Sequence, residues 1–197
     1  FVRKITVGII EDLKFEMPTE VYNSVIGNLV GDMYENYVLK RIDEIYNNVL
    51  GDRAFNDKYK NIELADCVID YGKDLVFIEV KARQMQKKYK LGQDYRDIER
   101  GMQDFLKSSG AKQLDRRIKE FKNGKIELGE IDSARVERFW PIIITCTENI
   151  PRFLNTEYKN LLDDYNYLQN PDIASLTILD LDDFDYFMEK IKNGTNM

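Results

Sequence analysis

The chain contains no histidine at all. Without an imidazole it cannot be a Ser-His or Cys-His hydrolase, an HNH-type nuclease or a histidine-based metalloprotease, and most catalytic zinc sites are excluded as well. Any metal ion must then be bound by oxygen ligands. Oxygen ligands select hard cations, so the candidates are Mg²⁺, Mn²⁺ and Ca²⁺.

Cysteine is scarce, with two residues, Cys67 and Cys146, and no CxxC pair. This argues against a zinc knuckle and a redox pair, and both cysteines lie in apolar runs typical of strands. Long apolar runs are also missing, since no stretch approaches the roughly 20 residues of a membrane span, and no signal peptide is visible. We therefore expect two buried thiols in a reducing compartment and a cytoplasmic protein with no membrane partner.

The net charge of −6 is unevenly distributed. Residues 81–125 carry 14 Lys and Arg against 6 Asp and Glu, a local charge of +8, and the remainder of the chain carries −14. A basic third within an acidic chain attracts phosphate locally. A lysine-rich helix surface is common in any protein, so this patch is weak evidence by itself.

Length and periodicity predict one domain over residues 1–197. We expect an arm or edge strand over 1–18, a core over 19–146 and an extension over 147–197. Apolar periodicity predicts four helical and five strand segments. The helices are expected over 20–49, 94–122 with a break at 108–110, 156–168 and 182–192, and the strands over 53–59, 67–69, 75–80, 138–146 and 173–180. This order predicts an α/β fold with a mixed central sheet flanked by helices.

A predicted hairpin forms the centre of this arrangement. Two β-branched runs, Cys67–Ile69 and Leu75–Val80, flank a turn-forming group. A two-residue loop at Gly72-Lys73 places Asp66 directly opposite Glu79. Because side chains alternate along a strand, Lys81 shares the face of Glu79.

Two opposed carboxylates repel each other and require a cation between them. One interpretation is that Lys81 supplies that cation and forms a solvated ion pair with Asp66 and Glu79. The other is a divalent metal site with a lysine beside it. Asp70, on the same face but nearer the turn, is a second candidate for the aspartate, and we prefer Asp66.

Helices on either side of the hairpin carry further candidates. Glu35 lies at the edge of the apolar face of the first helix. After the hairpin, Gln113 lies on the helix that follows the break. One face of that helix carries Lys112, Arg116 and Lys119, which we expect to contact a nucleic-acid backbone.

These residues in this order resemble the PD-(D/E)XK nuclease superfamily, over roughly residues 20–146. The matching positions are Glu35 for the helical glutamate, Asp66 for the first metal aspartate and Glu79-Val80-Lys81 for the Glu-X-Lys motif. Gln113 is similar to a glutamine that some branches place on the following helix. The proline that gives the superfamily its name is absent, because Ala65 precedes Asp66. The resemblance implies a restriction-endonuclease-like core and hydrolysis of phosphodiester bonds.

The residue types support that chemistry independently. A metal ion bound by Asp66, Glu79 and the Val80 carbonyl would lower the pKa of bound water and polarise a phosphoryl oxygen. Lys81 would orient the water and stabilise developing negative charge. Glu35 would be a supplementary ligand, and Gln113 would position water or phosphate. We expect Mg²⁺ as the cofactor, with Mn²⁺ able to substitute.

The predicted function is a metal-dependent nuclease, and we expect a DNA endonuclease rather than an RNA enzyme. Double-strand cleavage with one site per chain would favour a homodimer. A non-catalytic nucleic-acid-binding or assembly module on the same fold is the first alternative. An acidic interaction protein with no nucleic-acid role is the second, and it predicts none of the salt dependence expected of phosphate contacts.

Overall fold

A computed structural model of the chain describes residues 16–46, 49–51, 65–82, 95–108, 110–146 and 155–194. It has an α/β architecture with one five-stranded mixed sheet in the order β1-β2-β3-β4-β5. The first three strands are antiparallel, and β3, β4 and β5 are parallel to one another. The strands are β1 (Val49–Gly51), β2 (Cys67–Asp70), β3 (Asp74–Lys81), β4 (Arg138–Thr145) and β5 (Thr177–Asp180).

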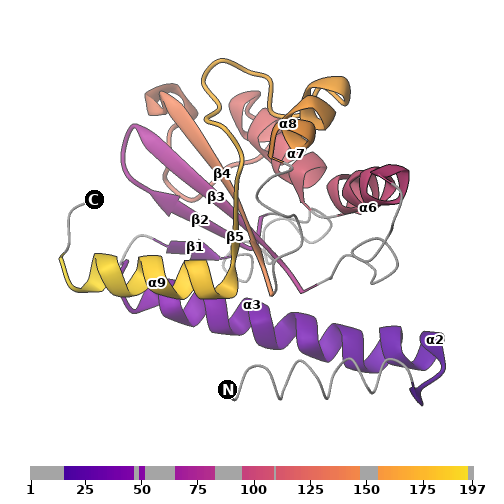
Figure 1. Ribbon diagram of the computed structural model, residues 1–197. Coiled ribbons are helices and arrows are strands. Elements are labelled where there is room, and N and C mark those ends of the chain that lie inside the picture. The colour runs from indigo at the N-terminus through magenta and orange to yellow at the C-terminus, as the bar shows by residue number, and fades with distance from the viewer. Residues whose placement is uncertain are drawn as a thin grey trace.

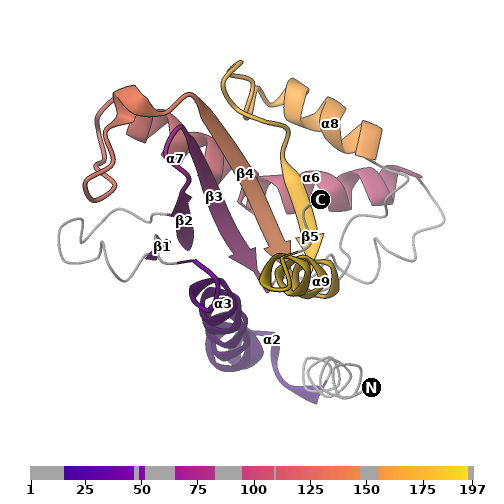
Figure 2. The ribbon, with the colours of Figure 1, turned by 90° about the vertical axis from the view of Figure 1, so that its left-hand side faces the viewer.

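Helices cover both faces of this sheet (Figures 1 and 2). On one face lie α6, α7 and α8; on the other lie α3, which continues a short α2 through a π-helical segment, and α9. Their bounds are α2 (Thr19–Val21), the π-helical segment (Tyr22–Gly27), α3 (Asn28–Asp43), α6 (Tyr95–Ser108), α7 (Ala111–Lys122), α8 (Asn155–Asp164) and α9 (Leu181–Lys192). A 3₁₀ turn, Ser133–Arg135, precedes β4.

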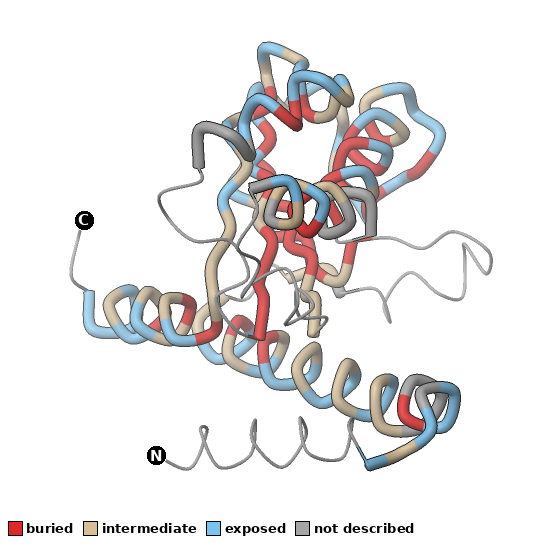
Figure 3. The backbone as a smooth tube through the Cα atoms, turned by 45° about the vertical axis from the view of Figure 1, so that its right-hand side comes forward, coloured by how far each residue is buried: buried red, intermediate tan, exposed pale blue. Residues whose placement is uncertain are grey.

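Each face of the sheet contributes to a separate apolar cluster, and buried residues concentrate along the strands and the helix faces toward them (Figure 3). Under α6, α7 and α8, the ring of Phe139 packs against Phe77 of β3 and Phe121 of α7, with centroids 6.1 and 6.2 Å away. Under α3 and α9, Ile42 packs with Ile78 of β3. The α/β architecture with a mixed sheet flanked by helices was predicted from the sequence and is confirmed.

The break predicted at residues 108–110 is also confirmed, because α6 ends at Ser108 and α7 begins at Ala111. The first predicted helix was too long: α3 ends at Asp43, and Val49–Gly51 pairs with β2 instead. Strand pairing here overrides a helical pattern that extended to Val49. The strand predicted over residues 53–59 and residues 1–15 of the arm or edge strand predicted over 1–18 lie outside the described residues.

Three C-terminal boundaries also differ from prediction. Helix α8 ends at Asp164 rather than near Leu168, where Asn166 and Leu168 adopt positive φ angles that no helix continues. The strand expected over 173–180 is reduced to a single bridge at Ile173 followed by β5. The last helix starts one residue before its predicted start, and its N-terminus is capped by Asp180, whose Oδ1 accepts from Asp183 N–H at 2.8 Å.

Pro141 lies in the middle of β4. Phe139 exchanges backbone hydrogen bonds with Asp172 and Ala174 on the β5 side. The backbone of Pro141, two residues further on, faces the same side. Pairing of β4 with β5 begins only at Ile142, so the missing N–H of Pro141 falls in the gap between the bridge and β5.

Candidate functional site

The hairpin register is the one predicted from the sequence. Cys67 pairs with Ile78 and Asp70 with Leu75, and Tyr71 N–H donates to the Asp74 carbonyl at 2.9 Å. Gly72, with φ +80, supplies the left-handed conformation of the two-residue loop. Extended one residue beyond its last pair, Cys67 with Ile78, this register would place Asp66 opposite Glu79, two residues before the end of β3.

Asp66 lies just before β2, and its side chain adds one more hydrogen bond to those between β2 and β3. Its Oδ2 accepts a hydrogen bond from Val80 N–H at 2.6 Å. The N–H and C=O of one strand residue point to the same neighbour. The Val80 carbonyl therefore faces the same side as Asp66, so the structure brings this carboxylate and this carbonyl together.

Glu79 and Lys81 form an ion pair on the face of the sheet covered by α7. The Glu79 side chain is 1% exposed and the Lys81 side chain 23% exposed. Lys81 Nζ also donates a long hydrogen bond, 3.4 Å, to Gln113 Oε1 in the first turn of α7. The ion-pair interpretation named both Asp66 and Glu79; the structure pairs Lys81 with Glu79, while Asp66 Oδ2 accepts from Val80 N–H, and the Glu79 carboxylate is buried rather than solvated.

Because this ion pair is buried, the cost of its desolvation must be counted against its attraction. A buried pair loses hydration on both charges, and apolar residues of similar volume are often equally or more stabilising. Thr145, in register with Lys81 on β4, is buried as well. Burial of this pair is therefore weak evidence that it stabilises the fold.

Gly110 brings α7 against this pair. It is buried, has φ +103, and a Cβ placed on it would lie 2.8 Å from Glu79 Cγ. The sequence indicated only a helix break at this position. No sequence signal gives its closeness to Glu79, because that distance is set by how α7 docks on β3.

The residues at this end of the sheet fit a hard cation in type. Asp66, Glu79 and the Val80 carbonyl offer oxygen donors from two adjacent strands, the ligand chemistry that Mg²⁺ and Mn²⁺ select. Within the described ranges, however, no three His, Cys, Asp or Glu side chains are grouped so that they could hold a metal ion. For Mg²⁺, water or substrate usually completes the coordination.

Glu35 comes from the other layer of the molecule. It lies on α3, whose buried residues Val38 and Ile42 pack on the face of the sheet opposite Glu79. Val80 N–H donates to Asp66, and Lys81 Nζ donates to Glu79 and to Gln113. Glu35 takes part in none of these three hydrogen bonds. Its role as a supplementary metal ligand stays a prediction.

Asp70, the second candidate aspartate, is engaged at the other end of the hairpin. Its Oδ1 accepts from Gly72 N–H at 2.8 Å, and its Oδ2 pairs with Arg135. Asp70 therefore stabilises the loop, which supports the preference for Asp66.

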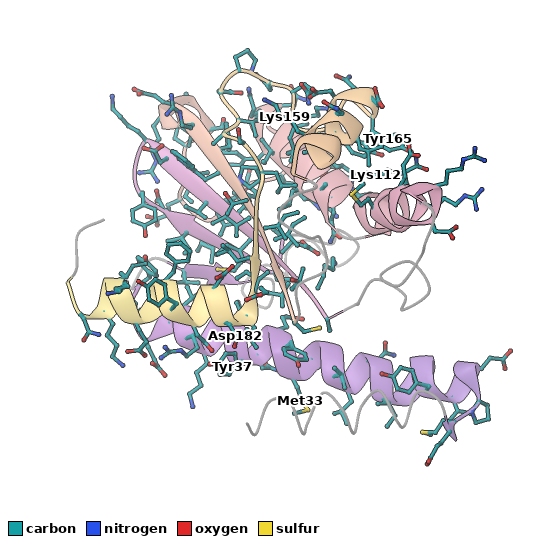
Figure 4. All side chains as sticks on the ribbon, viewed as in Figure 1. Met33, Tyr37, Lys112, Lys159, Tyr165 and Asp182 are labelled. Carbon is teal, nitrogen blue, oxygen red and sulfur yellow. The ribbon has the colours of Figure 1, made fainter. Side chains whose placement is uncertain are left out.

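The basic residues predicted on α7 lie on its exposed side. Lys112, Arg116 and Lys119 are all exposed, and Lys112, labelled in Figure 4, directly precedes Gln113. Lys119 Nζ pairs with Asp115 Oδ2 at 2.8 Å, while Asp115 Oδ1 accepts from Leu168 N–H at 2.9 Å. Part of this charge thus serves to join α7 to the segment after α8.

Comparison with known proteins adds the following. No family model matches the sequence, and no curated protein is similar to it by sequence. Among solved structures, the chain is similar to the small subunit of a heterodimeric restriction endonuclease, with a TM-score of 0.43 and 11% sequence identity over 82% of this chain and 69% of that one. No described helix has the length and apolarity to cross a membrane. What this chain does must therefore be argued from the site itself.

Proposed function

We propose that this protein is a metal-dependent nuclease that hydrolyses phosphodiester bonds, with DNA as its substrate and Mg²⁺, replaceable by Mn²⁺, as its cofactor. The observation that carries the proposal is the buried Glu79–Lys81 pair beside Asp66 at the end of parallel strands. Metal-dependent hydrolysis of a phosphodiester uses carboxylates that bind the ion and donors that stabilise the developing charge. Lys81 is such a donor, and Gln113 adds a polar amide beside it.

The negative charge of the site indicates that a cation is needed before a phosphodiester can bind. Asp66, Glu79 and Lys81 together carry a formal charge of −1. A phosphodiester also carries a negative charge and would be repelled. Asp66, Glu79 and the Val80 carbonyl would hold the divalent ion, which when bound lowers the pKa of coordinated water and polarises the phosphoryl oxygen.

Each side chain then has a separate task. The Lys81 ammonium, held between Glu79 and Gln113, would donate a hydrogen bond to a phosphate oxygen and stabilise the charge that develops on it. The Gln113 amide would fix the orientation of that amine. The burial of Glu79 keeps bulk water from screening these charges.

The experiment compares wild type with Lys81→Ala. Plasmid, single-stranded DNA and RNA are incubated with Mg²⁺, Mn²⁺ or EDTA. We expect wild-type cleavage of DNA that EDTA abolishes, and a loss of at least about 100-fold in Lys81→Ala, typical of losing one electrostatic donor. Lys73→Ala, an exposed lysine in the hairpin loop paired with Glu137, is the matched control and should cleave like wild type.

Calorimetric titration supplies a readout independent of turnover. Asp66→Asn and Glu79→Gln should weaken Mn²⁺ binding roughly 10-fold or more. Undiminished cleavage by Lys81→Ala would refute the catalytic assignment. DNA binding without cleavage by wild type would favour the non-catalytic module, which one observation supports: among the described residues, no three His, Cys, Asp or Glu side chains are grouped so that they could hold a metal ion.

A further inference from the structure

We infer that Gly110 is a positioning residue of this site: the absence of a side chain there lets the first turn of α7 press on Glu79 and so fixes both Glu79 and Gln113 around Lys81. The functional part of this inference rests on the proposed nuclease activity. The contact itself does not.

An added side chain at position 110 would lie too close to Glu79. A Cβ on residue 110 would lie 2.8 Å from Glu79 Cγ, 3.3 Å from Glu79 Cβ and 3.6 Å from Ile143 Cδ1. The first distance is shorter than real Cβ contacts, so one partner would have to move. Glu79 is buried and lies on a central strand, so its stem has no free space to move into.

The backbone conformation of Gly110 is a second reason for glycine at this position, independent of the contact with Glu79. Gly110 has φ +103, which residues with a side chain rarely adopt. Its carbonyl accepts the hydrogen bond of Leu114 N–H at 2.6 Å and so begins the α7 ladder. The conformation of Gly110 therefore sets the direction in which α7 leaves the sheet.

Gln113 connects the position of Gly110 with that of the Lys81 amine. Gln113 lies three residues after Gly110, within the first turn of α7, and its Oε1 accepts from Lys81 Nζ. The same lysine pairs with Glu79. A shift of this turn away from Glu79 would lengthen a hydrogen bond that is already 3.4 Å, so the amine would lose one of the groups that orient it.

The other described glycines with positive φ provide a matched control. Gly124, at φ +66 just after α7, has no atom within 4 Å of an added Cβ. Gly124→Ala therefore introduces a side chain at positive φ just beyond the end of the same helix without touching the site. Any effect that Gly110→Ala has beyond this control comes from the contact with Glu79 or from the direction of α7.

The first test measures the contact without any activity. Thermal unfolding is compared for wild type, Gly110→Ala, Glu79→Ala and the double variant, with Gly124→Ala as control. We expect Gly110→Ala to lower the midpoint by about 5 °C or more beyond the control, a shift typical of overpacking in a chain of this size. In the Glu79→Ala background, which lacks Cγ, most of that decrease should disappear.

The second test measures the function. For Gly110→Ala, we expect kcat for DNA cleavage to fall about 10- to 100-fold with KM changed less than about threefold, and Mn²⁺ affinity by calorimetry to fall about 10-fold, as for removal of a residue that orients metal ligands. Gly124→Ala should match wild type in all three. If Gly110→Ala is unfolded, restoration of folding by Glu79→Ala still demonstrates the contact.

Equal destabilisation in both backgrounds, or wild-type kcat and Mn²⁺ affinity in folded Gly110→Ala, would overturn the inference. Absence of cleavage by wild type refutes the proposed nuclease instead. Those two failures are distinguishable, because the unfolding cycle and the Mn²⁺ titration need no turnover.

Discussion

At the scale of single residues, burial decides which groups are available for chemistry. Lys81 is partly exposed and lies between two polar partners, while Cys67, on the opposite face of the same hairpin, is enclosed by apolar side chains. Burial raises the pKa of the Cys67 thiol to about 12, from an ordinary value of 9.0. Cys67 is therefore a core residue rather than a nucleophile.

This raised pKa predicts a pH effect on stability. In the unfolded chain the thiol ionises near pH 9, whereas in the folded chain it stays protonated to about pH 12. The unfolded state then binds fewer protons, so this contribution to the free energy of unfolding is full below pH 9 and is lost as pH rises toward 12. Its largest slope is about 1.4 kcal/mol per pH unit.

Urea unfolding between about pH 8 and 10.5 measures this effect. Cys67→Val removes the ionisable group and suits a strand, so its stability should fall less steeply with pH than that of wild type. Other groups, such as Tyr71, whose pKa burial also raises, titrate in both proteins and cancel in the comparison. Identical slopes would mean that Cys67 is not protected from ionisation.

At the scale of elements, α7 joins the site to the expected substrate surface. Its first turn contacts Glu79 and Lys81, its inner face packs on the sheet through Leu114, Ile118 and Phe121, and its outer face carries the basic residues. Because both faces belong to one rigid helix, α7 would fix the position of a bound nucleic-acid backbone relative to Glu79 and Lys81.

A substitution of the outer face tests this role. Lys112→Ala with Arg116→Ala should weaken DNA binding about equally for all sequences, because phosphate contacts carry no base information. The slope of log K against log salt concentration should fall by roughly 1 for each basic side chain that no longer binds a phosphate. Fluorescence anisotropy at several salt concentrations measures both quantities.

Lys192→Ala on α9 is the control for this experiment. Lys192 is also exposed but belongs to the helix on the other face of the sheet. Its removal should leave the salt slope unchanged. Equal slopes in wild type and the α7 double variant would place the backbone contacts elsewhere.

At the scale of the whole molecule, one sheet separates two apolar clusters that share β2, β3 and β4. Because alternate residues of the same strands belong to opposite clusters, neither cluster can lose its packing alone. Arg41 also joins α3 to Glu189 of α9 at 2.6 Å, and Tyr37, labelled in Figure 4, donates to Asp185 of α9 at 2.8 Å. We therefore predict one cooperative unfolding transition, as expected of a single domain.

Two core substitutions, one in each cluster, test this prediction. Phe121→Ala should cost about 3–5 kcal/mol and Ile42→Ala about 2–5 kcal/mol, since each leaves a cavity in a close-packed region. Far-UV circular dichroism and the fluorescence of Trp140, in the middle of β4, should report the same midpoint for each variant. Separate midpoints for the two probes would show two independently unfolding units.

The sequence by itself determined the parts that depend on local pattern. Alternation and turn chemistry over residues 65–82 predicted the hairpin, its loop at Gly72-Lys73 and the pairing of Asp66 with Glu79. Side-chain direction along a strand is fixed by the backbone, so Lys81 had to share the face of Glu79. The absence of histidine restricted the metal chemistry before any fold was known.

Only the tertiary structure decided what depends on contacts between distant segments. The burial of Glu79, the hydrogen bond from Lys81 to Gln113 and the approach of Gly110 all arise from the docking of α7 on β3, across about 30 residues of chain. The end of α3 at Asp43 was decided by pairing of Val49–Gly51 with β2. Local periodicity carries no information about such contacts, because their energy exists only once both partners are in place.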